Sequence, residues 1–317
     1  MQKLQEKYNI TEVFYKRYFE QNALNRMAME MLKFMWFKEG TFINPMKKDI
    51  IFEKYINEEK EAFFEKNILN IPQIEFCITT KCTLKCKDCC ALIPQLDKCK
   101  RSEMSFDNFK LYLDKLLSSV DSIRHLVILG GEPLINPELP QMLEYAAQQE
   151  KIFFIQLITN GTMLPQENLL NIMQKYNNRI YVYMSNYSDN PELKTILKQD
   201  EIKTLLKEKN IRLQKPENWP WTKELGLSKE EYSKKDTLIK FMYCNRTKCN
   251  TIMNGHIDIC SKASAGRELG LFKDDSIDII NSNDLRSKLI TFYQKEYLNA
   301  CKYCTITDIQ VQPALQL

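Results

Sequence analysis

The chain has 317 residues, with 45 Lys and Arg against 41 Asp and Glu, which gives a net charge of +4. That balance excludes a protein that binds polyanions over its whole surface, so we expect no nucleic-acid partner. Eleven cysteines are an odd number, so they cannot all pair within the chain, and two histidines rule out most histidine-based metal sites. Any bound metal is therefore expected on sulfur.

The sequence shows no targeting or membrane segment. No apolar stretch approaches the ~20 residues of a membrane span, and the first residues carry charges of both signs without an apolar core. We therefore expect a cytoplasmic protein without membrane contact, in a compartment where thiols stay reduced.

Residues 1–70 are expected to form a helical extension. Apolar residues recur at spacings of three and four between Val13 and Phe37, which is typical of amphipathic helices. Gly40 and Pro45 interrupt this pattern, and a second, charged helix is expected near Phe52–Asn67.

From residue 71 onwards, short apolar strands alternate with amphipathic helices. An interval of roughly 25–30 residues between strands favours βαβ units and a parallel sheet or barrel. In such folds the chemistry lies on the loops after the C-terminal strand ends. The expected strands are Ile74–Thr79, Ser122–Leu129, Lys151–Thr159, Arg179–Ser185 and Asn210–Gln214. The expected helices are Ser105–Ser119, Pro137–Glu150, Pro165–Tyr176 and Pro191–Lys209.

After about residue 216 the alternation stops and a cysteine-rich segment follows. Asn254-Gly255 lies between two short apolar runs, and it predicts a type I′ hairpin because that turn needs positive φ at both central positions. A helix is expected near Asn283–Asn299. The sequence therefore predicts three parts: 1–70, 71–240 and 241–317.

Three cysteines directly follow the first expected strand, in the pattern C-x3-C-x2-C. Three thiolates this close can bind three irons of a four-iron cube and leave the fourth iron open to a ligand. Zinc is the competing hypothesis, and it would need a fourth ligand nearby, such as Cys90. The three cysteines are Cys82, Cys86 and Cys89.

A second motif, Gly130-Gly131-Glu132-Pro133, follows the second expected strand. Adjacent glycines at a strand end let the backbone approach a ligand closely, and the glutamate adds a carboxylate. Gly-Gly turns alone are common, but together with the cysteine triplet this motif indicates one site.

The cysteine triplet followed by Gly-Gly-Glu-Pro resembles the radical S-adenosylmethionine (SAM) superfamily. The resemblance implies a partial (β/α)6 barrel of α/β class and a 4Fe-4S cluster whose open iron binds SAM. Cleavage of SAM then gives a 5′-deoxyadenosyl radical that abstracts hydrogen from the substrate. The family usually has an aromatic residue near the adenine at the position of Asp88. The resemblance assigns the cluster to Cys82, Cys86 and Cys89, and SAM to Gly130, Gly131, Glu132, Thr159, Asn160 and Ser185.

The C-terminal cysteines resemble the shorter, twitch form of the SPASM-type auxiliary-cluster appendage. Gly255 lies between the first two of them, and the other two follow the last expected helix. The resemblance implies a second 4Fe-4S cluster on Cys244, Cys260, Cys301 and Cys304, which makes two clusters in all. A structural zinc ion on the same four thiolates is the alternative.

The remaining cysteine, tryptophan and histidine residues have more than one possible role. Cys249 is a spare thiol, a replacement ligand of the auxiliary cluster, or the hydrogen-atom donor that an epimerase needs. Trp219 and Trp221 can stack on a sugar ring or a peptide side chain, or pack in the core. His125 and His256 receive no catalytic role.

The leading hypothesis is a radical SAM oxidoreductase or epimerase that dehydrogenates or epimerises a sugar-like small molecule. The N-terminal segment lacks the β-rich pattern of a domain that binds a peptide leader, which favours a small substrate over a SPASM-type peptide (RiPP) maturase. The alternative from another class is a zinc-stabilised, non-enzymatic binding protein. Basic residues around the cysteine loop suit docking of an acidic reductant such as flavodoxin: Lys81, Lys85, Lys87, Lys98, Lys100 and Arg101.

Overall fold

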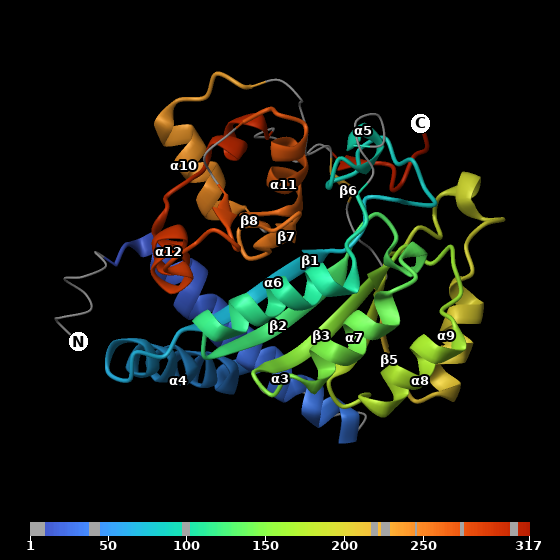
Figure 1. Ribbon diagram of the computed structural model, residues 1–317, viewed down its shortest axis with the longest axis horizontal. Coiled ribbons are helices and arrows are strands. Elements are labelled where there is room, and N and C mark those ends of the chain that lie inside the picture. Colours follow the sequence, from blue (N-terminus) through green and yellow to red (C-terminus); the bar gives the residue numbers. More distant parts are fainter. Residues whose placement is uncertain are drawn as a thin grey trace.

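One mixed sheet runs through the protein in the computed structural model, with helices on both sides (Figure 1). The strand order is β5-β4-β3-β2-β1-β7-β8-β9. The structure describes residues 10–37, 45–96, 102–216, 221–222, 229–244, 246–272, 276–304 and 310–317. The strands are β1 (Asn70–Cys77), β2 (Ser122–Leu129), β3 (Ile152–Thr159), β4 (Ile180–Met184), β5 (Arg212–Gln214), β7 (Thr251–Met253), β8 (His256–Asp258) and β9 (Ile277–Asp278).

Strands β1 to β5 are parallel to their neighbours, and β7 pairs parallel to β1 on its other side. Helical crossovers connect the parallel strands, which confirms the expected α/β class and the partial-barrel arrangement. The apolar side chains on the face that the crossover helices cover are buried, among them Ile74, Leu126 and Ile155.

The crossover helices cover one face of the sheet (Figure 1). Helix α6 shows how the sequence sets the start of such a helix. The Ser105 Oγ caps the first turn by accepting a hydrogen bond from the Asn108 N–H at 3.2 Å. The acidic Asp107 in the first turn also favours the start of the helix. Leu113 and Leu116 of this helix are fully buried. The crossover helices are α6 (Phe106–Ser119), α7 (Leu139–Gln148), α8 (Glu167–Lys175) and α9 (Gln199–Glu208), with shorter pieces α5 (Ile93–Leu96), η2 (Pro133–Ile135) and η3 (Pro191–Leu193).

The N-terminal extension is helical, and its helix α3 contacts β1 and β2. Aromatic side chains hold this extension together: the ring of Phe14 lies 4.9 Å from that of Tyr18 and 5.4 Å from that of Phe63 between centroids. The elements are α2 (Glu12–Phe14), the π-helical segment η1 (Tyr15–Glu20), α3 (Gln21–Phe37) and α4 (Pro45–Phe64).

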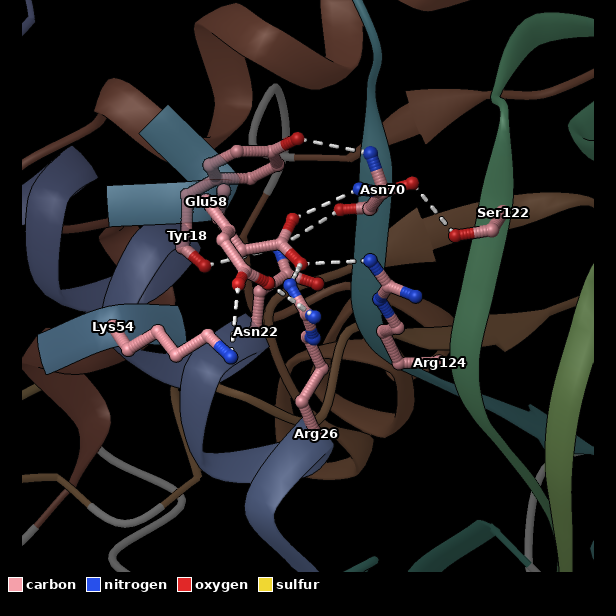
Figure 2. Close-up of polar contacts among 9 residues, drawn as sticks. Tyr18, Asn22, Arg26, Lys54, Glu58, Asn70, Ser122 and Arg124 are labelled. Atoms are coloured by element: carbon pink, nitrogen blue, oxygen red, sulfur yellow. Dashed lines mark hydrogen bonds and ion pairs between the residues drawn. The ribbon is translucent and has the colours of Figure 1, made fainter. Parts of the chain in front are cut away.

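A buried polar network joins these helices to the sheet (Figure 2). The carboxylate of Glu59 accepts hydrogen bonds from Arg124 at 2.7 Å, Asn70 at 2.8 Å and Arg26 at 3.2 Å. The Asn70 N–H also donates to the Tyr18 hydroxyl at 2.9 Å. Because Glu59 comes from α4 and Arg124 from β2, the network fixes the extension against the start of the sheet.

The cysteine-rich segment continues the same sheet through the β7–β8 hairpin. Asn254 and Gly255 have φ of 50° and 78°, which confirms the predicted turn. The proposed division into three parts remains a prediction. The other elements are α10 (Lys234–Tyr243), α11 (Ser261–Glu268), α12 (Leu285–Gln294), η4 (Asn299–Tyr303) and a two-stranded sheet of β6 (Trp221–Thr222) with β10 (Gln310–Val311). None of the described helices has the length and apolar composition needed to cross a bilayer.

Candidate functional site

A cavity of about 590 Å³ lies against the face of β1–β5 away from the crossover helices. Alternate residues of a strand share a face, so every second residue of these strands lines the cavity. Helix α3 closes the cavity near the strand starts with Asn25, Ala28 and Met29. The strand residues that line it include Gln73, Glu75, His125, Phe154, Gln156, Tyr181, Tyr183 and Gln214.

The three cysteines of the loop after β1 line the same cavity. They are free thiols, and burial raises the pKa of Cys86 to about 11 and that of Cys89 further. The Cys82 Sγ accepts from the Leu84 N–H at 3.4 Å and from the Asn160 Nδ2 at 3.6 Å. N–H donors directed at sulfur stabilise a thiolate, so the loop offers the environment that a sulfur-ligated cluster needs.

No group of three His, Cys, Asp or Glu side chains among the described residues surrounds a single ion position. The fit to a cluster therefore rests on the donor set: three thiols on one loop face one cavity, and N–H groups point at two of them. Cys90 also lines the cavity. Thiol ligands suit both iron–sulfur clusters and zinc, so the donor set alone does not choose between them.

The Gly-Gly-Glu-Pro motif packs directly against the cysteine loop. A Cβ on Gly131 would lie 2.2 Å from the Lys81 carbonyl oxygen and 2.8 Å from the Cys82 Cβ. A Cβ on Gly130 would lie 2.4 Å from the Thr79 carbonyl oxygen. Both glycines also line the cavity. Only glycine lets these two loops approach so closely.

Glu132 joins the ends of two strands. Its side chain is fully buried, and its carboxylate accepts from the Thr159 hydroxyl at 2.9 Å and the Asn160 N–H at 2.8 Å. Burial raises its pKa to about 7. Unlike Gly130 and Gly131, Glu132 is not among the described residues that line the cavity. The structure thus gives it a supporting role, and direct contact with SAM remains a prediction.

The other residues assigned to SAM by resemblance gather at the same end of the cavity. Thr159, Asn160 and Ser185 all line it. The Asn160 Nδ2 donates to the Thr83 hydroxyl at 3.0 Å, which ties the end of β3 to the cysteine loop. The Ser185 N–H donates to the Thr159 carbonyl at 3.0 Å.

An aromatic side chain reaches Asp88 from a distant part of the chain. The Trp221 Nε1 donates to the Asp88 carbonyl at 3.1 Å. The Tyr187 ring meets the Trp221 ring edge-on, with 5.6 Å between centroids, and both line the cavity. Trp219 lies outside the described residues.

The C-terminal cysteines approach one another. Burial raises the pKa of Cys260, and the neighbouring thiols of Cys304 and Cys244 raise it further. The Lys262 Nζ donates to the Cys304 Sγ at 3.3 Å. Burial lowers the pKa of the Lys240 ammonium group, and the nearby thiols of Cys304, Cys301 and Cys244 act in the opposite direction. Joint binding of one cluster by the four thiols remains a prediction.

Cys249 also lines the large cavity, from the segment before β7. Burial raises the pKa of its thiol, and the nearby carboxylate of Glu75 raises it further. Glu75 accepts from the Thr251 hydroxyl at 3.0 Å and from the Gln73 Nε2 at 3.2 Å. The thiol therefore lies beside a fixed, buried carboxylate.

His125 extends this polar chain across the cavity wall. Its Nδ1 lies 3.3 Å from the Gln73 Oε1, and its Nε2 lies 2.8 Å from the Tyr181 hydroxyl. Burial lowers its pKa to about 4, so the ring is neutral near pH 7. Sequence reasoning gave His125 no role and missed Gln73 and Glu75. Their polar side chains at alternating positions of apolar strands were the signal.

The basic residues around the cysteine loop are only partly described. Lys85 and Lys87 are exposed, and Lys81 is paired with Glu103 at 2.8 Å. Lys98, Lys100 and Arg101 lie outside the described residues.

The geometry so far defines an α/β protein with a thiol-lined site at the C-terminal ends of parallel strands. Residues 76–212 match the family model described as Radical SAM superfamily, so the chain carries a radical SAM domain. Such a domain implies a 4Fe-4S cluster and SAM, and the residues at the strand ends fit that role.

Curated relatives match only part of the chain. A GTP 3',8-cyclase of Syntrophomonas wolfei is 30% identical over 108 residues, which are 31% of this chain and 30% of that protein. A 7-carboxy-7-deazaguanine synthase of Aquifex aeolicus is 28% identical over 133 residues, 41% of this chain and 53% of that protein. The match spans less than two thirds of the length of each relative.

Solved structures show a similar partial likeness. BtrN in complex with AdoMet and 2-DOIA has a TM-score of 0.43 and 15% identity, covering 77% of this chain and 96% of that one. Streptococcus suis SuiB bound to the precursor peptide SuiA has a TM-score of 0.38 and 17% identity, covering 61% of this chain and 44% of that one.

Proposed function

We propose that the chain is a radical SAM oxidoreductase or epimerase that removes a hydrogen atom from a sugar-like small molecule. The observation that carries this proposal is that the loop thiols and the polar strand residues line one and the same cavity. When bound, the cluster and SAM supply the 5′-deoxyadenosyl radical. The chain's own residues hold the target C–H within reach of it and exclude side reactions.

The polar wall of the cavity supports a substrate with hydroxyl groups. Gln156 is nine-tenths buried and lines the cavity, and its side chain has no hydrogen-bond partner among the described residues. Tyr183 and Gln214 line the cavity in the same way, and their side chains have no partner there either. Uncharged donors and acceptors of this kind match hydroxyl groups better than ions.

The size of the cavity supports a small substrate over a peptide. Its volume of about 590 Å³ must hold the cluster and SAM as well as the substrate, which leaves space for a small molecule only. Met29 of α3 packs against Phe154 and Tyr181 and closes the inner end. A peptide substrate would have to end against this wall, which makes a peptide maturase the second choice.

Aromatic surface near Asp88 supports the SAM site. Trp221 and Tyr187 bring rings to the backbone of Asp88, where relatives carry an aromatic side chain. We infer that Trp221 replaces that side chain beside the adenine.

A second 4Fe-4S cluster on Cys244, Cys260, Cys301 and Cys304 is part of the proposal. A cluster on four thiolates is anionic, and the ammonium group of Lys262 lies 3.3 Å from the Cys304 Sγ. A cation at that distance offsets the negative charge of the ligands.

Cys249 is the proposed hydrogen-atom donor if the reaction is an epimerisation. It lines the cavity from the segment before β7, whereas the loop thiols line it from the loop after β1. A donor on a different wall from the abstracting radical returns hydrogen to the other face of the carbon and inverts it.

Anaerobic purification with a pair of cysteine variants tests the proposal. We expect about eight irons in the wild-type protein, about four in Cys82→Ala, and no release of 5′-deoxyadenosine from SAM by that variant. Cys90→Ala, which removes a neighbouring thiol, is expected to keep about eight irons and to release 5′-deoxyadenosine from SAM. A colourless zinc protein that leaves SAM intact would overturn the proposal.

Turnover in deuterated water then separates the reactions. Solvent deuterium at one substrate carbon, lost in Cys249→Ala, indicates epimerisation. A product oxidised by two electrons indicates dehydrogenation, and a modified peptide indicates the maturase.

A further inference from the structure

Residues 313–317, here called the strap, lie across the cysteine loop although the two are far apart in sequence. The Leu317 N–H donates to the Lys85 carbonyl at 2.9 Å, and the Lys87 N–H donates to the Leu315 carbonyl at 2.7 Å. These two bonds bracket the second cysteine of the loop in an antiparallel bridge. In Figure 1 the end of the chain accordingly lies near α5 and β6.

The side chain of Gln316 uses both ends of its amide on this loop. Its Oε1 accepts from the Lys85 N–H at 2.8 Å, and its Nε2 donates to the Ala314 carbonyl at 2.5 Å and to the Cys86 Sγ at 3.6 Å. The backbone N–H can only donate, so it fixes which end of the amide is oxygen. The amide nitrogen carries two hydrogens, so it can donate to the Ala314 carbonyl and to the Cys86 sulfur together.

The strap is held in place from its other side. The Asn190 Nδ2 donates to the carbonyls of both Pro313 and Ala314 at 3.0 Å. Ala314 is fully buried and packs in one apolar cluster with Leu84 and Leu193. Its φ of 53° is unfavourable for alanine, and such a conformation persists only where the surroundings enforce it. The strap is therefore a fixed element of the site.

We propose that Gln316 is a positioning residue of the radical SAM site, and that its amide N–H hydrogen-bonds the Cys86 sulfur when that sulfur ligates iron. This inference rests on the proposed function. Reduction adds negative charge to the cluster and its sulfurs, so an N–H donor stabilises the reduced form and raises the reduction potential. Asn160 makes the same kind of contact with Cys82 at 3.6 Å.

Two substitutions of Gln316 separate this role from simple packing. Gln316→Glu keeps an oxygen for the Lys85 N–H, removes the N–H donors to Cys86 and Ala314, and adds negative charge. Gln316→Ala removes all three contacts. Gln312→Ala is the matched control, because Gln312 is exposed and its side chain forms no hydrogen bond with a described residue.

The measurement is the midpoint potential of the cluster whose EPR signal changes when SAM is added. We expect Gln316→Glu and Gln316→Ala to reduce the equilibrium constant for reduction of the cluster by about threefold to tenfold. A tenfold change lowers the midpoint potential by about 59 mV for one electron. Gln312→Ala is expected to match the wild type. Amide hydrogen exchange of the metal-free protein gives a second readout: the Lys85 N–H stays protected in Gln316→Glu and exchanges roughly threefold faster or more in Gln316→Ala.

The outcomes are distinct. A wild-type protein that holds iron, with the same potential in all four proteins, overturns this inference and leaves the proposed function intact. A wild-type protein that holds no iron overturns the proposed function, and this inference with it.

Discussion

Replacing Glu59 by Gln tests the buried network that fixes the N-terminal helices to the sheet. The side chain of Glu59 is 1% exposed, and its carboxylate contacts two guanidinium groups, those of Arg124 and Arg26, at 2.7 Å and 3.2 Å. A glutamine keeps the shape but removes the charge and points an N–H₂ group at donors. Arg124 then has no carboxylate among the described residues, while Arg26 keeps its ion pair with Glu58.

The size of the effect follows from burial. Removing one partner of a buried ion pair costs about 3–5 kcal/mol, because the other charge stays buried without compensation. We expect about 3 kcal/mol for Glu59→Gln, the lower end of that range, because Arg124 is 13% and Arg26 25% exposed. The structural consequence is a looser α3, which carries Met29 at the inner end of the cavity.

Urea unfolding followed by circular dichroism measures the loss of unfolding free energy. Glu58→Gln is the matched control: it makes the same chemical change in the same helix, but Glu58 is 38% exposed, so we expect less than about 1 kcal/mol. If Glu59→Gln is no more destabilising than Glu58→Gln, the network does not anchor the helices and the reasoning is wrong.

Three further predictions concern the loops and the cavity wall. Gly131→Ala places a Cβ 2.2 Å from the Lys81 carbonyl oxygen and should displace the cysteine loop. Iron analysis after reconstitution is then expected to show a loss of about four irons. Retention of all the iron would contradict this. Lys85→Glu together with Lys87→Glu should reduce the salt dependence of cluster reduction by flavodoxin, and an unchanged dependence would refute docking at this loop. The pKa of His125 is about 4 in the folded protein and near 6.5 in the unfolded chain, so the unfolded state binds more protons between these values. Stability should therefore fall as the pH is lowered from about 6.5 towards 4, and His125→Gln should flatten that slope in urea midpoints measured at several pH values.

Local signals in the sequence predicted much of the fold. The expected strand Ser122–Leu129 matches β2 at both ends, and Ser105 begins α6 as expected. These elements are governed by apolar patterns and by one capping side chain. Strand β1 begins at Asn70, before the expected Ile74, because Pro72 within it made the start look like a loop.

Contacts between distant segments were not predictable in this way. The spacing of the loop cysteines indicated their site, but nothing near them in sequence indicated Gln316, which reaches Cys86 from 230 residues away. Glu59 looked like one more charge on a solvated helix, but α4 packs against α3, and Glu59 is buried where it meets Arg124 of β2. Such features depend on tertiary structure, which periodicity does not encode.

The pairing of β1 with β7 has a consequence for how the protein is made. Glu75 pairs with Thr251, which lies 176 residues later in the chain. At synthesis rates of about 5–20 residues per second, this side of β1 waits about 9–35 s for its partner. Until then its backbone N–H and C=O groups form an open edge that any other extended chain can join. Pairing with β7 covers this edge at Glu75 and Phe76, so we expect a nascent chain stalled before β7 to aggregate more readily than a chain that includes β7.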